Sequence, residues 1–480
     1  MAKNSRTLIH LGCCASMLVA LSRPALAQPC QPAWSALGAG IDGQVFALGV
    51  WDPDGDGPAD AVLLAGGNFT AAGGVPANNV AQWDGEAWSP LGDGVDDPNF
   101  GGVVWSFATF DEDDGGPNPP RLFVGGDFTL AGGVEAHNIA RWDGSSWSAV
   151  GDGVRGPLPD VLALAVFDDD ASGPNPPALF AGGEFDFAGE VVAHKVARWN
   201  GNSWSAVGTG VGDDFGFVSA LHVHDEDGPG PTPPALFIGG EFSLIGGVSA
   251  NNVARWNGSA FSALGTGTNG FVDDLAAFDE DADGPNPPRL FACGAFSRAG
   301  GTTVNGLGRW NGTSWSSVGG GFNSPAFALA VFDEDGLDPN PPALFAGGIF
   351  SSAGGTPATR IARWNGASWS ALGNGVDGML LDLVAFDRDG PGGAAGALVA
   401  GGVFDTAGAV PAARVASWVG CEPPAPCPGN FDGDGAVGLG DLALLLAAYG
   451  VSAGGDMDAD GDTDLADLSL FLAAYGTSCP

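Results

Sequence analysis

Hydrophobic residues along most of the chain come in short runs, separated by stretches rich in glycine, proline and aspartate. In one group these runs are "VLALAVFD" from Val161, "ALFAGGEF" from Ala178, "KVARWN" from Lys195 and "SWSAVG" from Ser203. They are rich in β-branched and aromatic residues and too short for typical helices, which predicts β-strands. The pattern indicates a protein built mainly of short strands joined by tight turns.

The group of four runs recurs, and a Gly-Gly-x-Phe landmark follows the second run of each copy. The seven landmarks, 54 to 59 residues apart, begin at Gly66, Gly125, Gly182, Gly239, Cys293, Gly347 and Gly401. Between runs three and four, six copies have an Asn-Gly or Asp-Gly dipeptide, which favours a type I′ hairpin turn. Such a turn places Trp142 and Trp147 on one face of their hairpin, where they can pack against a neighbouring sheet.

Seven copies of four antiparallel strands predict an all-β fold, either a closed seven-bladed β-propeller or an open solenoid. The chain ends distinguish the two. Trp418 of the last copy has no second Trp after it, whereas the segment "CQPAWSALGAG" from Cys30 carries Trp34 in a fourth run without a third. A closed ring explains this divided hairpin, because the shared sheet leaves no exposed edge. The sequence therefore favours the propeller.

The Gly-Gly after the second strand, followed by Trp, a turn and Trp, resembles the kelch family of propeller blades over residues 45–419. The Trp spacing and the longer first loop differ from that family. Cys30 and Cys421 align beside the missing turn, so a disulfide is predicted there. Cys427 and Cys479 bracket the C-terminal segment and are also predicted to pair, whereas Cys293 is predicted to be buried.

The first residues are typical of a secretory signal peptide. Lys3 and Arg6 precede an apolar run over residues 8–21, and Ala25-Leu26-Ala27 offers a cleavage site. We therefore expect a protein that is secreted or held at the cell surface, where disulfides form. The formal net charge of −40 argues against nucleic-acid partners and anionic membrane surfaces and favours cations such as calcium. No later apolar stretch is long enough to span a membrane.

The C-terminal segment contains two 12-residue acidic patterns, "NFDGDGAVGLGD" from Asn430 and "DMDADGDTDLAD" from Asp456, each leading into an apolar helix-forming run. Oxygen ligands at positions one, three, five and twelve, with a carbonyl at seven, are what a calcium loop needs. The predicted ligands are Asn430, Asp432, Asp434, Ala436 and Asp441 in the first loop, and Asp456, Asp458, Asp460, Asp462 and Asp467 in the second. Ala436 and Asp462 would contribute their carbonyl oxygens.

These duplicated loop-and-helix units resemble the dockerin family over Cys427–Cys479. The resemblance implies a small all-α calcium-binding domain that docks secreted proteins, often polysaccharide-degrading enzymes, onto cohesin partners. Loop positions ten and eleven, which usually carry recognition side chains in cellulosomal dockerins, depart from that pattern and are Leu439-Gly440 and Leu465-Ala466 here. The expected partner is a cohesin-like or another cell-surface protein. The predicted organisation is a signal peptide (1–27), a propeller (28–421), a linker (422–426) and this domain (427–480).

Each copy also has an acidic loop between its first and second strands. The first, "DPDGDGPAD", resembles the calcium hairpins of FG-GAP blades, with Asp52, Asp54, Asp56 and Asp60 as its predicted calcium ligands. In the other loops the final Asp is replaced, often by Pro, so we predict rigid, solvated turns there. His222 and His224 alternate on one strand and could bind a metal, although a polar pair on a strand is the favoured interpretation.

Candidate catalytic residues do not stand out. The only tyrosines, Tyr449 and Tyr475, lie in the C-terminal segment, which excludes propeller chemistry that needs a Tyr. An active site needs residues that break the repeat, yet most acids recur, and the singular Glu190, Lys195 and histidines form no recognisable set. The favoured function is therefore a non-catalytic binding or scaffold propeller with a carbohydrate or protein ligand. The alternative is a polysaccharide hydrolase or lyase with carboxylates at the propeller mouth.

Overall fold

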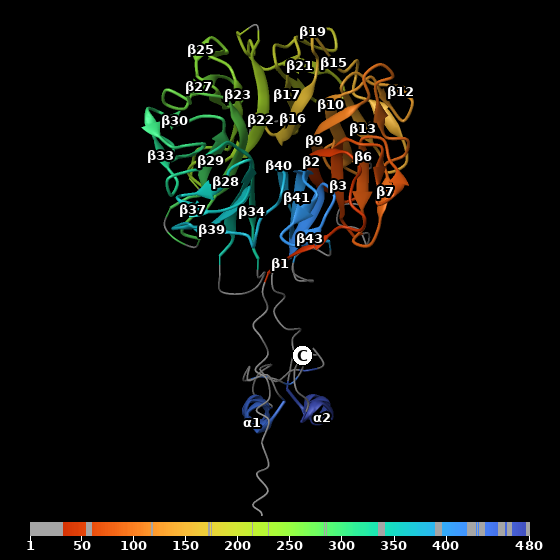
Figure 1. Cartoon of the computed structure of the whole chain (residues 1–480), viewed down its shortest axis with the longest axis vertical. Helices are drawn as coiled ribbons and strands as arrows, with labels where there is room; N and C mark the ends of the chain where they lie inside the picture. Colours follow the sequence, from red (N-terminus) through yellow and green to blue (C-terminus); the bar gives the residue numbers. More distant parts are fainter. Residues whose placement is uncertain are drawn as a thin grey trace, which may run out of the picture. The chain divides into compact units, whose positions relative to one another are not determined.

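The computed structural model describes residues 32–53, 60–116, 119–170, 173, 175–213, 215–228, 230–282, 284, 286–334, 341–388, 396–419, 429, 431, 437–449, 457 and 463–476. Over residues 32–419, the described parts consist of strands, turns and loops (Figure 1). In the C-terminal segment they include two helices, α1 (Leu439–Ala448) and α2 (Leu465–Ala474). No helix in the described ranges is long and apolar enough to cross a membrane.

The described strands form seven four-stranded antiparallel sheets, numbered here along the chain. The first four sheets are β2 (Gln44–Trp51), β3 (Val62–Asn68), β6 (Val80–Trp83) and β7 (Trp88–Pro90); β9 (Val103–Phe110), β10 (Arg121–Asp127), β13 (Ile139–Trp142) and β14 (Trp147–Ala149); β16 (Val161–Phe167), β17 (Ala178–Gly183), β20 (Val196–Trp199) and β21 (Trp204–Ala206); and β22 (Phe217–His224), β23 (Ala235–Glu241), β26 (Val253–Trp256) and β27 (Phe261–Ala263). The last three are β28 (Val272–Phe278), β29 (Arg289–Gly294), β32 (Leu307–Trp310) and β33 (Trp315–Ser317); β34 (Ala326–Phe332), β35 (Ala343–Gly348), β38 (Ile361–Trp364) and β39 (Trp369–Ala371); and β40 (Met379–Phe386), β41 (Ala397–Val403), β44 (Val415–Val419) and β1 (Ala33–Ala36). The remaining described strands are two residues long and form small sheets of two or three strands, such as β4 (Ala71–Ala72) with β5 (Val75–Pro76).

The first strands of successive sheets contact one another from β2 through β9, β16, β22, β28 and β34 to β40, and β40 in turn contacts β2. These first strands, which we call the inner strands, therefore lie in a closed cycle (Figure 1). An open solenoid does not fit, because its first and last sheets would not touch. The arrangement is consistent with a β-propeller.

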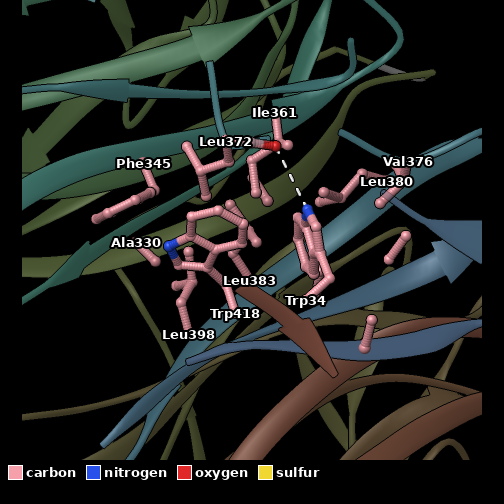
Figure 2. Packing of buried hydrophobic residues seen from close by; sticks show 14 of the residues in the cluster. Trp34, Ala330, Phe345, Ile361, Leu372, Val376, Leu380, Leu383, Leu398 and Trp418 are labelled. Carbon is pink, nitrogen blue, oxygen red and sulfur yellow. Dashed lines mark hydrogen bonds between the residues drawn. The ribbon is translucent and has the colours of Figure 1, made fainter. Parts of the chain in front are cut away.

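The seventh sheet is completed by the two ends of the ring. Strand β1 pairs with β44, and Trp34 lies opposite Trp418 in the register. The two indole rings are 5.3 Å apart, and Trp34 Nε1 donates a hydrogen bond to the carbonyl of Leu372 in the preceding sheet, at 3.3 Å (Figure 2). The predicted divided hairpin is thus confirmed. Cys30, Cys421, Cys427 and Cys479 lie outside the described residues, so their predicted disulfides stay predictions.

The hydrophobic core consists of clusters that join neighbouring sheets. Figure 2 shows one of them, in which Phe345 of the sixth sheet packs with Leu383 and Leu398 of the seventh. The landmark glycines allow this close packing. A Cβ atom on Gly66 would lie 2.4 Å from the Val104 side chain of the next sheet, so no larger residue fits without a shift. Cys293 occupies the same position in the fifth sheet and is fully buried, as predicted.

The described part of the C-terminal segment has a small core of its own. Val437, Leu445 and Phe471 are buried together, and Phe431 stacks on Phe471 at 6.2 Å between ring centres. The two helices have matching sequences, LGDLALLLAA and LADLSLFLAA. They also expose matching leucines, with Leu446 and Leu472 more than half exposed. The domain boundaries predicted from the sequence stay predictions.

Candidate functional site

The glutamate in the acidic loop of four sheets joins neighbouring sheets together. Glu226 forms an ion pair with Arg255 of its own sheet, at 3.0 Å, and accepts a hydrogen bond from Trp310 Nε1 of the next sheet, at 2.9 Å. We call this acid–arginine–tryptophan arrangement the latch. Equivalent latches contain Glu112, Arg141 and Trp199; Glu280, Arg309 and Trp364; and Glu334, Arg363 and Trp418. The prediction of merely solvated turns missed this role.

The latch is incomplete in the other three sheets. Asp169 of the third sheet is one methylene shorter and pairs with Arg198 at 3.0 Å, while Trp256 Nε1 is buried without a hydrogen-bond partner. Pro53 and Arg388 occupy the position in the first and seventh sheets. The five acids at the latch positions therefore serve to hold the sheets, and the other two positions carry no acid.

Two of the four predicted calcium ligands in the first acidic loop are described. Asp60 lies 3.0 Å from Arg388 Nε, so its carboxylate already forms an ion pair with a guanidinium group. Asp52 directly follows strand β2. Asp54 and Asp56 lie outside the described residues. Among the residues described, no group of three His, Cys, Asp or Glu side chains is placed to hold a metal ion. Calcium at this loop stays a prediction.

At the opposite end of the sheets, the residues change from one sheet to the next. We call this end the mouth; it comprises the starts of the inner strands and the loops that precede them. Each inner strand has a β-bulge near its start, for example at Trp105 and Phe46, whose partly exposed rings lie 4.3 Å apart. Phe217 and Phe271 form a second partly exposed aromatic pair at 6.3 Å.

Three carboxylates gather at the mouth of the second and third sheets. Asp160 Oδ1 accepts a hydrogen bond from the backbone N–H of Glu184 at 2.8 Å. Burial, together with the charges of Glu184 and Asp127, raises the pKa of Asp160 to about 6, and Lys195 opposes this rise. Neighbouring carboxyl groups, one of which has a raised pKa, are a common basis for acid–base chemistry. The cluster was not predicted, because Asp127 lies in a different copy from Asp160 and Glu184.

Lys195 lies beside this cluster, where it opposes the rise in the pKa of Asp160. Its side chain is buried, and Nζ forms an ion pair with Asp186 at 3.0 Å. Its backbone φ of 66° lies in the left-handed region, where four other sheets use Asn79, Asn138, Asn252 and Asn305 and the last two use Arg360 and Arg414. Arg414 pairs in the same way with Asp405, the equivalent of Asp186. A lysine is less suited to that conformation than asparagine, so the ion pair, rather than the backbone, explains the residue. Glu190, also singular in the sequence, pairs with Arg155 at 2.9 Å.

Acidic residues on the inner strands cap the free edge of the next sheet. Asp274 Oδ2 accepts from Leu329 N of the sixth sheet at 2.8 Å, and Asp382 Oδ2 accepts from Leu48 N of the first at 2.6 Å. Burial raises their pKa values to about 8 and about 7. In the described part of the chain, no cation pairs with either residue. Protonation therefore removes the charge whose burial is unfavourable.

The two histidines of β22 are placed as a polar pair within the sheet. His224 is buried against Phe237, with 5.8 Å between ring centres. Burial, with a smaller effect from the neighbouring His224, lowers the pKa of His222 to about 4. Both side chains are therefore neutral at physiological pH.

Of the predicted calcium ligands in the C-terminal segment, the two residues at position twelve are described. Asp441 and Asp467 are fully buried at the first turns of α1 and α2. Asp441 accepts from the N–H of Gly438, and Asp467 from that of Asp464, both at 2.7 Å. The remaining ligands, at positions 430, 432, 434, 436, 456, 458, 460 and 462, lie outside the described residues.

Comparisons with known proteins give limited information. No protein-family profile matches the chain, and no curated protein matches it in sequence. Similar solved structures include BBS1N in complex with ARL6DN (11% identity, 80% of this chain, 96% of that chain, TM-score 0.43). Others are a GH74 enzyme of Niastella koreensis (14%, 73% and 50%, 0.42) and a PL11 rhamnogalacturonan lyase of Bacillus licheniformis (12%, 81% and 76%, 0.37). The chain thus spans about half of that GH74 enzyme. These likenesses are too remote to bear on function.

Proposed function

We propose that this chain is a secreted, non-catalytic binding protein built on a seven-bladed, kelch-like propeller. The mouth holds a carbohydrate or protein ligand, and a dockerin-like tail attaches the protein, with calcium bound, to a cohesin-like or other cell-surface partner. The observation that carries this proposal is the contrast between the latch positions and the mouth. The acids at the latch positions pair with arginines of their own sheets, whereas Glu184 and Glu241 at the mouth take part in none of the ion pairs formed by the described residues.

Exposed apolar side chains at the mouth support a ligand there. Loops before the inner strands of the second, third and fourth sheets expose Phe100, Leu158 and Phe215 at 89%, 70% and 90%. Together with the partly exposed aromatic pairs, they offer apolar surface beside hydrogen-bonding groups. Ligand sites commonly combine these two properties.

A polysaccharide-degrading enzyme is the second candidate, and Asp160 favours it. A carboxyl group with a pKa of about 6 could donate a proton to a leaving oxygen, with the neighbouring Glu184 as the second carboxyl group of the pair. The test is a glycan array combined with a reducing-end release assay on the mature chain. Binding without cleavage supports the first proposal. Cleavage that Asp160→Asn abolishes would replace it with the second.

The tail proposal can be tested separately in the intact chain. All 15 tryptophans lie between residues 34 and 418, and both tyrosines lie in the tail, so each part has its own probe. With 3-fluorotyrosine incorporated, we expect chelation by EDTA to collapse two resolved ¹⁹F resonances toward one unfolded position while Trp fluorescence stays constant. The acidic loops have little core to offset their repulsion without a cation. Unchanged resonances in EDTA would contradict a calcium-organised tail.

A further inference from the structure

A hollow among the described residues lies at the mouth, between the fourth and fifth sheets. Its volume is about 840 Å³, within the range of roughly 300–1,000 Å³ typical of small-molecule sites. Its lining includes Phe215, Glu241, Asn251, Thr268, Asn269 and Arg298. These residues combine an aromatic ring, both signs of charge, amides and a hydroxyl.

The walls of this hollow are fixed by hydrogen bonds between its own groups. Asp213 Oδ2 accepts from Ser243 N at 2.5 Å and from Leu244 N at 3.0 Å. Asn251 Nδ2 donates to the carbonyl of Thr266 at 2.9 Å, and Asn269 Oδ1 accepts from the backbone N–H of Arg298 at 2.8 Å. Fixed walls reduce the ordering cost of binding.

Three other side chains of the hollow are available to a ligand. Phe215 is 90% exposed. Glu241 and Arg298 are exposed as well, and none of the ion pairs formed by the described residues includes either of them. Arg298 also breaks the repeat, because the equivalent residues are Ala71, Leu130, Phe187, Leu244, Ser352 and Thr406. An unpaired acid, an unpaired guanidinium and an aromatic ring thus line one preformed space.

We infer that this hollow binds a segment of a neutral oligosaccharide; the inference rests on the proposed function of the mouth. Sugar hydroxyls both donate and accept, which suits Glu241 as acceptor and Arg298 as donor. The Phe215 ring provides an apolar surface for the C–H face of a pyranose ring. Polyanionic chains are disfavoured by Glu241, by Asp213 and by the net charge of −40.

The experiment is isothermal titration of the mature chain in calcium with cellohexaose, xylohexaose and mannohexaose, and with hexagalacturonate as the acidic counterpart. Phe215→Ala and Arg298→Ala are compared with Phe187→Ala as a control, because Phe187 is an aromatic residue of strand β18 (Phe187–Ala188) that is 42% exposed and does not line the hollow. Equal melting temperatures would establish that all variants fold. We expect Phe215→Ala and Arg298→Ala each to weaken binding of a neutral hexasaccharide about tenfold, or about 1.4 kcal/mol. Phe187→Ala should leave it within about twofold, since isolated surface substitutions have small effects.

The outcomes separate this inference from the proposal on which it rests. A neutral sugar that binds wild type and all three variants equally would overturn the hollow as its site and leave the binding function intact. Preference for hexagalacturonate, lost in Arg298→Ala, would overturn the neutral class. No binding of any glycan by wild type would contradict both the inference and the carbohydrate form of the proposed function.

Discussion

At the latch end of the ring, the same acid, arginine and tryptophan recur from sheet to sheet, and the contacts they make are internal. At the mouth, one acid recurs as a backbone cap, as Asp42 and Asp213 show, whereas the aromatic rings and the exposed apolar side chains differ from sheet to sheet. The difference shows that abundance of acidic residues is a poor guide to function in a repeat protein. What distinguishes the acids proposed to face a ligand, such as Glu241, is that none of the ion pairs formed by the described residues includes them.

The sharpest way to break this comparison is to remove one acid from each end. Glu280→Ala leaves Arg309 and Trp364 Nε1 without their partner in a largely buried place, so we expect a loss of roughly 3 kcal/mol in the free energy of unfolding. Glu241→Ala at the mouth should change it by less than about 0.5 kcal/mol. Urea unfolding followed by Trp fluorescence measures both. Equal losses would erase the distinction between the two ends.

The second way uses pH. Because Asp274 and Asp382 have raised pKa values of about 8 and about 7, the folded state holds more protons than the unfolded state between about pH 4 and pH 8. Their contribution to stability is fully present below pH 4 and falls as pH rises through that window. Asp274→Asn cannot ionise, so it should flatten this decline in urea unfolding measured between pH 5 and pH 9.

Asp42, at the mouth of the first sheet, is the matched control with the opposite sign. Burial opposes ionisation of Asp42, but hydrogen bonds from Thr70 and Ala71 outweigh it and lower its pKa. Asp42→Asn should therefore cost stability at neutral pH and lose its effect as pH falls below about 4.

A variant Asp274→Asn with the same pH slope as wild type would show that the inner-strand acids are ionised in the fold.

The smallest expected effect is a gain. Asp169→Glu adds the methylene that the third sheet lacks, so its carboxylate should reach Trp256 Nε1 and complete the latch with Arg198. One new buried hydrogen bond is worth about 1 kcal/mol. Thermal unfolding checks this prediction. Unchanged or lower stability would show that length of the acid is not what leaves the latch incomplete.

Much of the ring could be predicted from the sequence because its determinants are local. Strand runs, the Asn-Gly turns and the divided pair of Trp34 and Trp418 sit within short stretches or at the chain ends. The latch could not, because Glu280 and Trp364 are 84 residues apart and meet only through the packing of neighbouring sheets. The surroundings of Asp160 were missed for the same reason. The hollow beside Phe215 lies between two sheets, and a pattern of residues along the chain does not predict the space between them.

The seam between β1 and β44 also sets an order of events during synthesis. Ser417 Oγ bonds to the carbonyl of Ser35 across 382 residues of chain, so β1 has no partner until nearly all of the ring has been made. The other six sheets can each form from one continuous stretch as soon as that stretch is available. Until the last strand arrives, β1 is a free strand and the seventh sheet has an open edge, and such edges invite pairing with other chains. The step that closes the ring is therefore also the step that ends the growing chain's exposure to aggregation.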